Sequence, residues 1–356
     1  MKHWIAVALA LCAFSAAARD YLVVASRPNR LHVIDLAARR VANTFEIPGK
    51  GVVGTITLPR DGKVAYVLTN RNESVVGIDL ESGKQVFRAD MSEPGVRVKS
   101  MFAVAVSQDG TQLFVHQIPT RIKPAEYEVM PTRIAVYRTA DGVGAAPARV
   151  FPAPRRIGML ATGPHGNRLM ALGWDMYVID AVTGKVDKTF PLRNWKREGM
   201  GEPDLLAFWP QYEQTGVFAA PYYAPRTNVE PTSPEAFQLG MLTFDLDTEK
   251  MEVAEVANAE TAIFSSVINP ANRNEVFAVM NQVTKIDLAT RKIVKQAPTD
   301  RSYYAMNISS DGKELYLGGA TDLISVYDSA TLRKTAEIAI PGGHDQGASS
   351  MRIIRR

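Results

Sequence analysis

The sequence predicts an all-β fold, a seven-bladed β-propeller of four-stranded antiparallel blades whose first blade is closed by the C-terminal strand. Three observations carry this prediction. One strand–turn–strand phrase recurs seven times, a second turn signal precedes most copies, and the chain ends in a β-run that belongs to no copy. No segment has sustained 3.6-residue periodicity, which argues against α/β folds.

The recurring phrase is a β-run ending in aspartate, a turn that usually carries Ser or Thr and a base, and another β-run. Six copies keep the aspartate: HVIDLAARR at 32–40, VGIDLESGK at 76–84, YVIDAVTGK at 177–185, LTFDLDTEK at 242–250, TKIDLATRK at 284–292 and SVYDSATLR at 325–333. The weaker copy IAVYRTADG at 134–142 has Arg138 instead. Asp79 or Asp180 can accept backbone N–H groups of the turn, and Gly83 or Gly184 can adopt positive φ, so the chain reverses tightly.

A second turn signal precedes most copies and completes the blade. It reads Asp61-Gly62, Asp109-Gly110, His165-Gly166 and Asp311-Gly312, each followed by a β-run. Each unit is therefore a strand, a turn, a strand, a short link, a strand ending in Asp, a turn and a strand, in about 42 residues. The units with longer spacing, the third and the fifth, are expected to carry inserted loops.

The two ends of the chain predict how the ring closes. The first unit opens with β-runs at 21–26, 31–36 and 41–47 and so lacks one strand, whereas 349–355 is a β-run without a unit. We expect the terminal run to become the innermost strand of the first blade, because this removes an unpaired edge. Residues 19–356 are thus predicted to form one propeller domain.

Residues 1–18 have the pattern of a signal peptide that is removed after Ala18, which predicts a periplasmic product. A basic start at Lys2 and His3 precedes an apolar stretch that is too short to span a bilayer. Cys12, the single cysteine, lies in this leader, so the mature chain has no thiol. Of 41 basic residues Lys2 is lost, and the remaining 40 face 37 acidic residues. This near-neutral balance predicts no nucleic-acid partner, and no later apolar run predicts a membrane span.

Function is expected in the segments that depart from the repeat, because plain repeats build scaffold. These segments are 118–132, 192–211, 221–238 and the approach to the last blade at 300–304. The second and third are expected to expose aromatic side chains, which are frequent anchors of protein interfaces. The candidates for a pocket wall or subunit interface are Trp195, Phe208, Trp209, Tyr303 and Tyr304. Tyr212, Tyr222 and Tyr223 belong to the same group of aromatic residues. For Phe208 and Trp209 a position in the core of a blade is an equal alternative.

No catalytic, cofactor-binding or metal-binding residues are predicted in this chain. The mature histidines His32, His116, His165 and His344 are widely spaced and have no partner at metal-site spacing, so structural or solvated roles are expected. Nucleophile-elbow, phosphate-loop and dinucleotide patterns are absent from the sequence.

Two resemblances narrow the prediction. The segment AYVLTN at 65–70, followed by VGIDLESGK, resembles the YVTN group of bacterial propellers. The β subunit of quinohaemoprotein amine dehydrogenase is similar over the whole mature chain, including linkers outside the repeat. The segments that carry this second resemblance are PLRNWKREG at 191–199, PDLLAFWPQ at 203–211, the pair Tyr303-Tyr304, LYLGG at 315–319, IPGG at 340–343, NRLHVIDL at 29–36 and VYRTADG at 136–142.

This resemblance implies a periplasmic heterotrimer that oxidises primary amines to aldehyde and ammonia. A dihaem cytochrome c large subunit would carry haem c, and a small subunit would carry cysteine tryptophylquinone; a soluble electron-acceptor protein would take the electrons. The propeller would be non-catalytic, would pack on both partners and would wall the amine pocket so that water is excluded.

Two alternatives remain open from the sequence. The chain could be the propeller chain of a tryptophan-tryptophylquinone amine dehydrogenase, whose small partner differs in cofactor. It could instead be a stand-alone propeller enzyme such as a lactonase, which would need metal or acid–base groups around the central channel.

Overall fold

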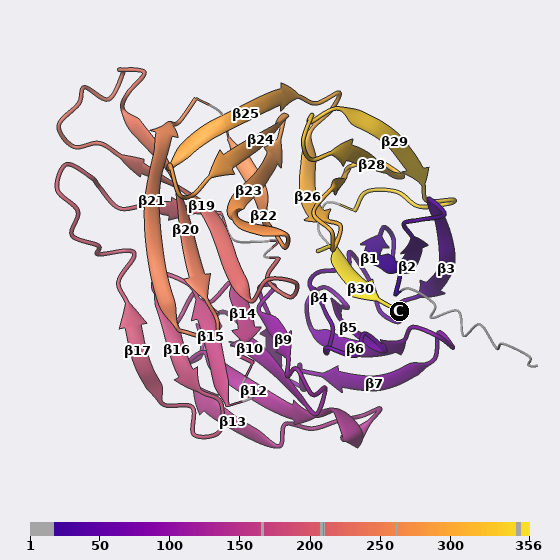
Figure 1. Ribbon diagram of the computed structural model, residues 1–356. Helices are drawn as coiled ribbons and strands as arrows, with labels where there is room; N and C mark the ends of the chain where they lie inside the picture. Colours follow the sequence, from indigo (N-terminus) through magenta and orange to yellow (C-terminus); the bar gives the residue numbers. More distant parts are fainter. Residues whose placement is uncertain (1–17, 165–166, 207–208, 210, 261, 347–349) are drawn as a thin grey trace, which may run out of the picture.

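Seven β-sheets stand around a central axis in the computed structural model, which describes residues 18–164, 167–206, 209, 211–260, 262–346 and 350–356 (Figure 1). Each sheet contains a four-stranded antiparallel blade. The predicted fold class, a seven-bladed β-propeller, is confirmed. The described part of the chain contains no helix with the length and apolar character of a membrane span.

Apart from the closing strand β30, the first four blades are formed by the N-terminal half of the chain. Their strands, from the innermost outward, are β30 (Arg352–Arg355), β1 (Asp20–Ser26), β2 (Arg30–Asp35) and β3 (Arg40–Glu46); β4 (Ile56–Thr57), β5 (Val64–Thr69), β6 (Ser74–Asp79) and β7 (Gln85–Asp90); β9 (Val104–Val106), β10 (Gln112–Ile122), β12 (Arg133–Arg138) and β13 (Arg149–Pro152); and β14 (Met159–Thr162), β15 (Arg168–Leu172), β16 (Met176–Asp180) and β17 (Val186–Phe190). Blade 3 also carries β8 (Val96–Lys99), β11 (Tyr127–Val129) and the short 3-10 helix η1 (Thr139–Asp141).

The last three blades follow the same order. Their strands, again from the innermost outward, are β18 (Asp204–Leu205), β19 (Val217–Pro225), β20 (Phe237–Asp245) and β21 (Lys250–Asn258); β22 (Ile263–Asn269), β23 (Asn272–Met280), β24 (Gln282–Asp287) and β25 (Lys292–Pro298); and β26 (Tyr303–Ile308), β27 (Glu314–Gly319), β28 (Leu323–Asp328) and β29 (Lys334–Ala339).

The ring closes between the two ends of the chain, as predicted. Strand β30 pairs antiparallel with β1, with Asp20 opposite Arg355 and Val23 opposite Arg352, and Figure 1 shows the yellow β30 beside the indigo first blade. The backbone of Arg19 and Arg356 is hydrogen-bonded in both directions, at 2.7 and 3.0 Å. The first blade therefore joins residues from opposite ends of the sequence, and the ring cannot open without breaking this pairing.

The turn within each phrase has a residue with positive φ at the same position in all seven units, although in blade 3 the turn is formed by the 3-10 helix η1. The carboxylate of Asp79 accepts the Ser82 N–H at 2.7 Å, and Asp180 accepts the Thr183 N–H at 2.7 Å. The residue four positions after the aspartate, or after Arg138, has positive φ in every unit: Arg39, Gly83, Gly142, Gly184, Glu249, Arg291 and Leu332. Glycine was expected there, yet four units place another residue in this left-handed conformation, which costs about 1–2 kcal/mol without glycine. The local hydrogen bonds hold the turn even so.

A pair of substitutions tests this turn. Gly184→Ala is expected to lower the free energy of unfolding by about 2 kcal/mol or more. Its φ is 75°, and an added Cβ would lie 2.2 Å from the ring of Phe151, a buried residue. Arg291 is exposed and occupies the same turn position in blade 6, with φ 56°. Arg291→Gly is expected to change the free energy of unfolding by less than about 1 kcal/mol, because relief of backbone strain offsets the entropy that glycine adds to the unfolded chain. Equilibrium urea unfolding measures the free energy of unfolding of both variants. If the two substitutions lowered it equally, the explanation by positive φ and the contact with Phe151 would be contradicted.

The core lies between the blades. The middle strands of each blade are mostly buried, whereas outer strands such as β3 alternate between exposed and half-buried residues. Phe114 and Ile134 of blade 3, for example, pack in one cluster with Leu169 and Ile179 of blade 4. Apolar side chains are therefore shared between neighbouring sheets around the ring.

The strand order divides the molecule into two faces. Because neighbouring strands are antiparallel, the links between blades and the turns from the second to the third strand of each blade share the face at which the inner strands begin. We name this the insertion face. The repeated Asp turns and the Asp-Gly turns lie at the opposite end, the turn face. Three of the predicted departures, 118–132, 221–238 and 300–304, lie at the insertion face, whereas 192–211 begins there and continues past β18 toward the channel. Figure 1 shows the loops around blades 4 and 5 projecting beyond the ring.

Two of these departures differ from the loops that the sequence suggested. Most of 118–132 is β-structure, because β10 runs on to Ile122 and pairs there with both β8 and β11. Much of 221–238 is likewise strand, since β19 continues to Pro225 and β20 starts at Phe237. Pro119 and Pro221 lie within these strands, although proline has no N–H to donate to a neighbouring strand.

Candidate functional site

An aromatic cluster lies where inner strands of blades 6 and 7 begin. The ring of Phe264, in β22, is 6.2 Å from Trp209 at an interplanar angle of 85° and 5.4 Å from Tyr304, in β26, at 59°. All three side chains are half-buried. Edge-on and tilted ring packing of this kind holds each ring in place while leaving part of it accessible. The cluster therefore brings the predicted candidates Trp209 and Tyr304 together at the channel mouth on the insertion face.

Tyr303 points the other way from Tyr304, because successive residues of a strand face opposite sides. Its side chain is 1% exposed and packs between blades 6 and 7. The hydroxyl donates to a carboxylate oxygen of Asp300 at 2.7 Å and lies 2.7 Å from the Ser325 hydroxyl. Burial raises the pKa of the Tyr303 phenol, so it stays a neutral donor. In the chain alone Tyr303 ties the link before blade 7 to the blade; its candidate role at an interface stays a prediction.

Trp195 fastens the link between blades 4 and 5. Its ring Nε1–H donates to the carbonyl oxygen of Gly201 at 2.7 Å, and its ring meets Tyr222 edge-on at 5.2 Å. The Arg197 guanidinium lies 5.1 Å from the ring centroid. The side chain is half-buried, so one edge remains accessible on the insertion face. Phe208, the remaining candidate, lies outside the described residues.

The expectation that Tyr212 and Tyr222 are exposed is wrong. Tyr222 is 1% and Tyr212 is 8% exposed, and both belong to the core cluster of blades 4 and 5. Tyr222 is an inward residue of the extended β19, and Tyr212 donates a long hydrogen bond of 3.4 Å to the Leu160 carbonyl of β14. Tyr223 is half-buried, and its hydroxyl accepts the Ile263 N–H at 2.6 Å. Their position in segments outside the repeat did not reveal which side of the strand these rings occupy.

Further anchors on the insertion face were not found in the sequence. Trp174, between β15 and β16, is 38% exposed, and the guanidinium groups of Arg193 and Arg156 lie 4.2 and 5.0 Å from its ring. Asp175 fixes this corner by accepting the Leu192 N–H at 2.8 Å. A Trp between two arginines is an ordered platform of the residue types that dominate interface energies.

The extended β10–β11 hairpin has one apolar and one charged side. Ile122 and Tyr127 are opposite one another and are 45% and 74% exposed, and Val129 extends the same row. On the other side Arg121 pairs with Glu128 at 3.0 Å. The signal that could have found this hairpin is the alternation of residues 118–122, which predicts a strand if Pro119 is tolerated.

The central channel is crossed by residues 211–216, which we name the channel plug. Blade 5 has a two-residue inner strand, β18, and the chain then leaves the blade. Gln211 accepts a hydrogen bond from Asn307 of β26 at 2.9 Å and one from Arg352 of β30 at 3.1 Å. Gln214 donates to the carbonyl of Ile308 at 2.8 Å. The plug thus links blade 5 to blades 7 and 1 across the axis.

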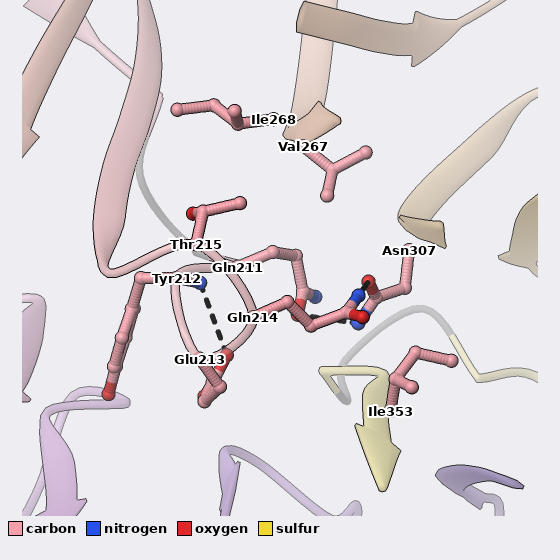
Figure 2. A pocket seen from close by; sticks show the side chains of 9 residues that line it. All are labelled: Gln211, Tyr212, Glu213, Gln214, Thr215, Val267, Ile268, Asn307 and Ile353. Carbon is pink, nitrogen blue, oxygen red and sulfur yellow. Dashed lines mark hydrogen bonds between the residues drawn. The ribbon is translucent and has the colours of Figure 1, made fainter. Parts of the chain in front are cut away.

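Arg352 is the centre of these contacts. It is 3% exposed, donates to the Ile56 carbonyl of β4 at 2.8 Å and lies 3.0 Å from Glu213 of the plug. Figure 2 shows Gln211 and Gln214 directed toward Asn307, with Tyr212 on the other side of the loop. The cavity beside the plug measures about 10 Å³, the space of about one water, so no larger ligand fits at this level.

The described histidines have structural surroundings or lie in solvent. His32 contacts the hydroxyls of Ser26 at 2.8 Å and Thr44 at 2.9 Å, and His116 Nε2 lies 3.1 Å from the Pro154 carbonyl. His344 is exposed, and His165 is outside the described residues. Among the residues that the structure describes, no three His, Cys, Asp or Glu side chains gather as a metal site.

Fold and site together define the class: a seven-bladed β-propeller with a plugged channel and an insertion face that carries aromatic and arginine side chains. No family model matches the chain, and no curated protein matches it. Three solved structures are similar in fold. Hydrazine synthase of Kuenenia stuttgartiensis has a TM-score of 0.57 at 13% identity over 87% of this chain and 89% of that chain.

The second structure is the dihydro-heme d1 dehydrogenase NirN in complex with DHE, with a TM-score of 0.52 at 15% identity over 92% of this chain and 74% of that one. The third, a protein of unknown function from Desulfotomaculum acetoxidans, has a TM-score of 0.62 at 12% identity over 94% and 99%. At these identities the likeness establishes the shared propeller fold. Two of these structures are named as oxidoreductase or synthase enzymes, so the fold occurs in that setting.

Proposed function

We propose that the chain is the non-catalytic propeller (β) subunit of a periplasmic quinohaemoprotein amine dehydrogenase. It binds a dihaem cytochrome c subunit and a small subunit that carries cysteine tryptophylquinone, and it walls the pocket for a primary amine. The observation that carries the proposal is the gathering of most of the non-repeat segments on one face, together with half-buried Trp209, Phe264 and Tyr304.

The particular family is supported by where its matching segments lie. Residues 191–199 and 340–343 belong to links between blades, and the pair Tyr303-Tyr304 begins β26, so these three segments meet at the insertion face. The described part of 203–211 contains β18 and the start of its connection to β19. The sequence of a link between blades can change without loss of the propeller fold. The likeness of these segments to that β subunit therefore favours a shared set of partners.

The physical role proposed for the face is to cover a reactive group that another chain owns. Partly exposed rings such as Tyr304 and Trp174 bury much area at little cost in side-chain entropy. A closed apolar wall excludes water and strengthens the fixed electrostatic interactions of the site. The haem and the quinone supply the redox chemistry on the partner chains, and electrons leave through a soluble acceptor protein.

A pull-down from the native periplasm tests the proposal. The affinity-tagged full chain is expected to recover a haem-stained polypeptide and a small quinone-stained polypeptide, and the complex should reduce a dye when a primary amine is added. Trp209→Ala with Tyr304→Ala is expected to lower recovery at least about tenfold, as loss of two interface anchors would. The mass of the small chain distinguishes cysteine tryptophylquinone from tryptophan tryptophylquinone.

Two further variants keep the test informative. Val182→Ser, at a 61% exposed site on the turn face, should leave recovery unchanged. Tyr127→Ser alters an insertion-face residue that is 74% exposed and so should fold normally while weakening recovery. Recovery of the unaltered chain alone, or equal recovery for all variants, would refute the proposal.

A further inference from the structure

A large cavity lies on the turn face, away from the aromatic cluster. It is a cavity of about 780 Å³ at the end of the channel, between the plug and the points where the inner strands finish. Thr57 of β4, Val106 of β9, Thr162 of β14 and Ile354 of β30 line it. Pockets for small organic molecules measure about 300–1,000 Å³, so this one has the size of a ligand site.

The charged groups of this cavity are mostly arginines. Arg60, Arg273, Arg352 and Arg355 line it, whereas Glu213 and Asp247 are the lining carboxylates. Glu213 is held by the buried Arg352 at 3.0 Å. The cavity wall therefore carries more guanidinium groups than carboxylates, and low-dielectric walls strengthen the resulting potential.

The rim arginines have weak competing partners. Arg273 lies 3.9 Å from Asp245, and Arg355 lies 3.5 Å from Asp20. Arg60 donates to the neutral side-chain amide of Gln108. Arg273 and Arg355 are 62% and 60% exposed, so they can turn toward a bound anion at little cost. Guanidinium groups are the preferred partners of carboxylates and phosphates because they can donate two parallel hydrogen bonds.

Between these charged groups and polar side chains such as Gln108 and Thr162, part of the wall is apolar. Leu58 and Pro59 come from the first turn of blade 2, Leu246 and Pro270 from the turns of blades 5 and 6, and Ile353 and Ile354 from β30. An inorganic anion would leave this surface uncovered, whereas an organic anion with a ring or alkyl body would cover it.

We propose that the turn-face cavity binds a small organic anion, its carboxylate or phosphate held by Arg60, Arg273 and Arg355 and its apolar body packed against Leu58, Leu246 and Ile353. The plug forms the floor of this site, because 211–216 closes the channel behind it. The site is independent of the proposed partners, which meet the opposite face.

Calorimetric titration of the purified full chain with 2-naphthoate, 2-naphthyl phosphate and the neutral 2-naphthamide tests the proposal. At least one anion should bind with a Kd below about 1 mM, and the amide should bind at least about tenfold more weakly. The stronger of the two anions identifies the head group. Arg60→Gln with Arg273→Gln should weaken anion binding at least about tenfold and leave the urea midpoint unchanged.

The matched control is Arg40→Gln, which removes an exposed arginine outside the cavity. It should leave anion binding unchanged. Equal binding of amide and anions, anion binding that survives the double substitution, or no anion binding at millimolar concentration would each overturn the proposal. None of these outcomes depends on whether the pull-down recovers partner chains.

Discussion

Arg352→Ala is expected to lower the free energy of unfolding by about 3 kcal/mol, because the buried Ile56 carbonyl and the Gln211 side-chain oxygen both lose a charged donor. Arg352 is 3% exposed and connects β30 to the plug through Gln211 and Glu213 and to blade 2 through the Ile56 carbonyl. Its loss leaves a carboxylate and a carbonyl without their donor in the middle of the ring. Because β30 closes the first blade, the effect should appear as cooperative loss of the whole propeller.

Equilibrium urea unfolding measures this change in the free energy of unfolding. Two further variants test whether it comes from the contacts of Arg352. Arg355→Ala removes a 60% exposed arginine on the same strand and should cost less than about 1 kcal/mol. Arg352→Met with Glu213→Gln should recover part of the loss, because the uncompensated charge is then gone. If Arg352→Ala lowers the free energy of unfolding no more than Arg355→Ala does, the contacts of Arg352 with the plug do not stabilise the closed ring.

Lowering the pH from 8 to 5 is expected to destabilise the chain by about 2 kcal/mol for each of two buried histidines. Burial, and secondly the charge of Arg30, lowers the pKa of His32 to about 4. Burial also lowers the pKa of His116 to about 4, against the opposing hydrogen bond to the Pro154 carbonyl. In the unfolded chain both titrate near 6.5. A depressed folded pKa means that the unfolded state binds more protons, so stability is full above pH 6.5 and falls as the pH drops toward 4.

Single substitutions isolate this dependence from that of the carboxylates. His116→Gln keeps a donor for the Pro154 carbonyl but cannot titrate, and it should remove about half of the difference in unfolding free energy between pH 8 and pH 5. His32→Gln should have a similar effect on the slope, whatever it costs at pH 8. His344→Gln, at an exposed site, is the control and should follow the unaltered chain. A pH profile that is identical in all four proteins would rule out the buried histidines as its cause.

The candidate site could be predicted in part. Trp209 and Tyr304 were recognisable as aromatic residues in segments outside the repeat, and the structure brings them together. Phe264, which joins them, lies within β22 and has no sequence signal that separates it from a core residue. Tyr303 and Tyr304 are neighbours in sequence but face opposite sides of their strand, which the pair alone does not reveal.

By itself the sequence determined the number of blades, the repeated turn and the closing strand. These depend on contacts within a few residues, such as Asp79 with Ser82, or on a strand count that leaves one partner for the last β-run. Local hydrogen bonds and strand alternation require particular residue types at regular positions in the sequence. Because this pattern occurs seven times, it can be recognised from the sequence alone.

Only the tertiary structure decided how the channel is closed and which faces carry functional groups. The plug bonds join Gln211 to Asn307, 96 residues away, and Glu213 to Arg352, 139 residues away. Such contacts form because the ring brings distant inner strands to one axis, and polar residues that meet there must satisfy one another once they are buried. No local sequence pattern predicts which of these distant residues come into contact. Their contacts can be identified only in the assembled ring of seven blades.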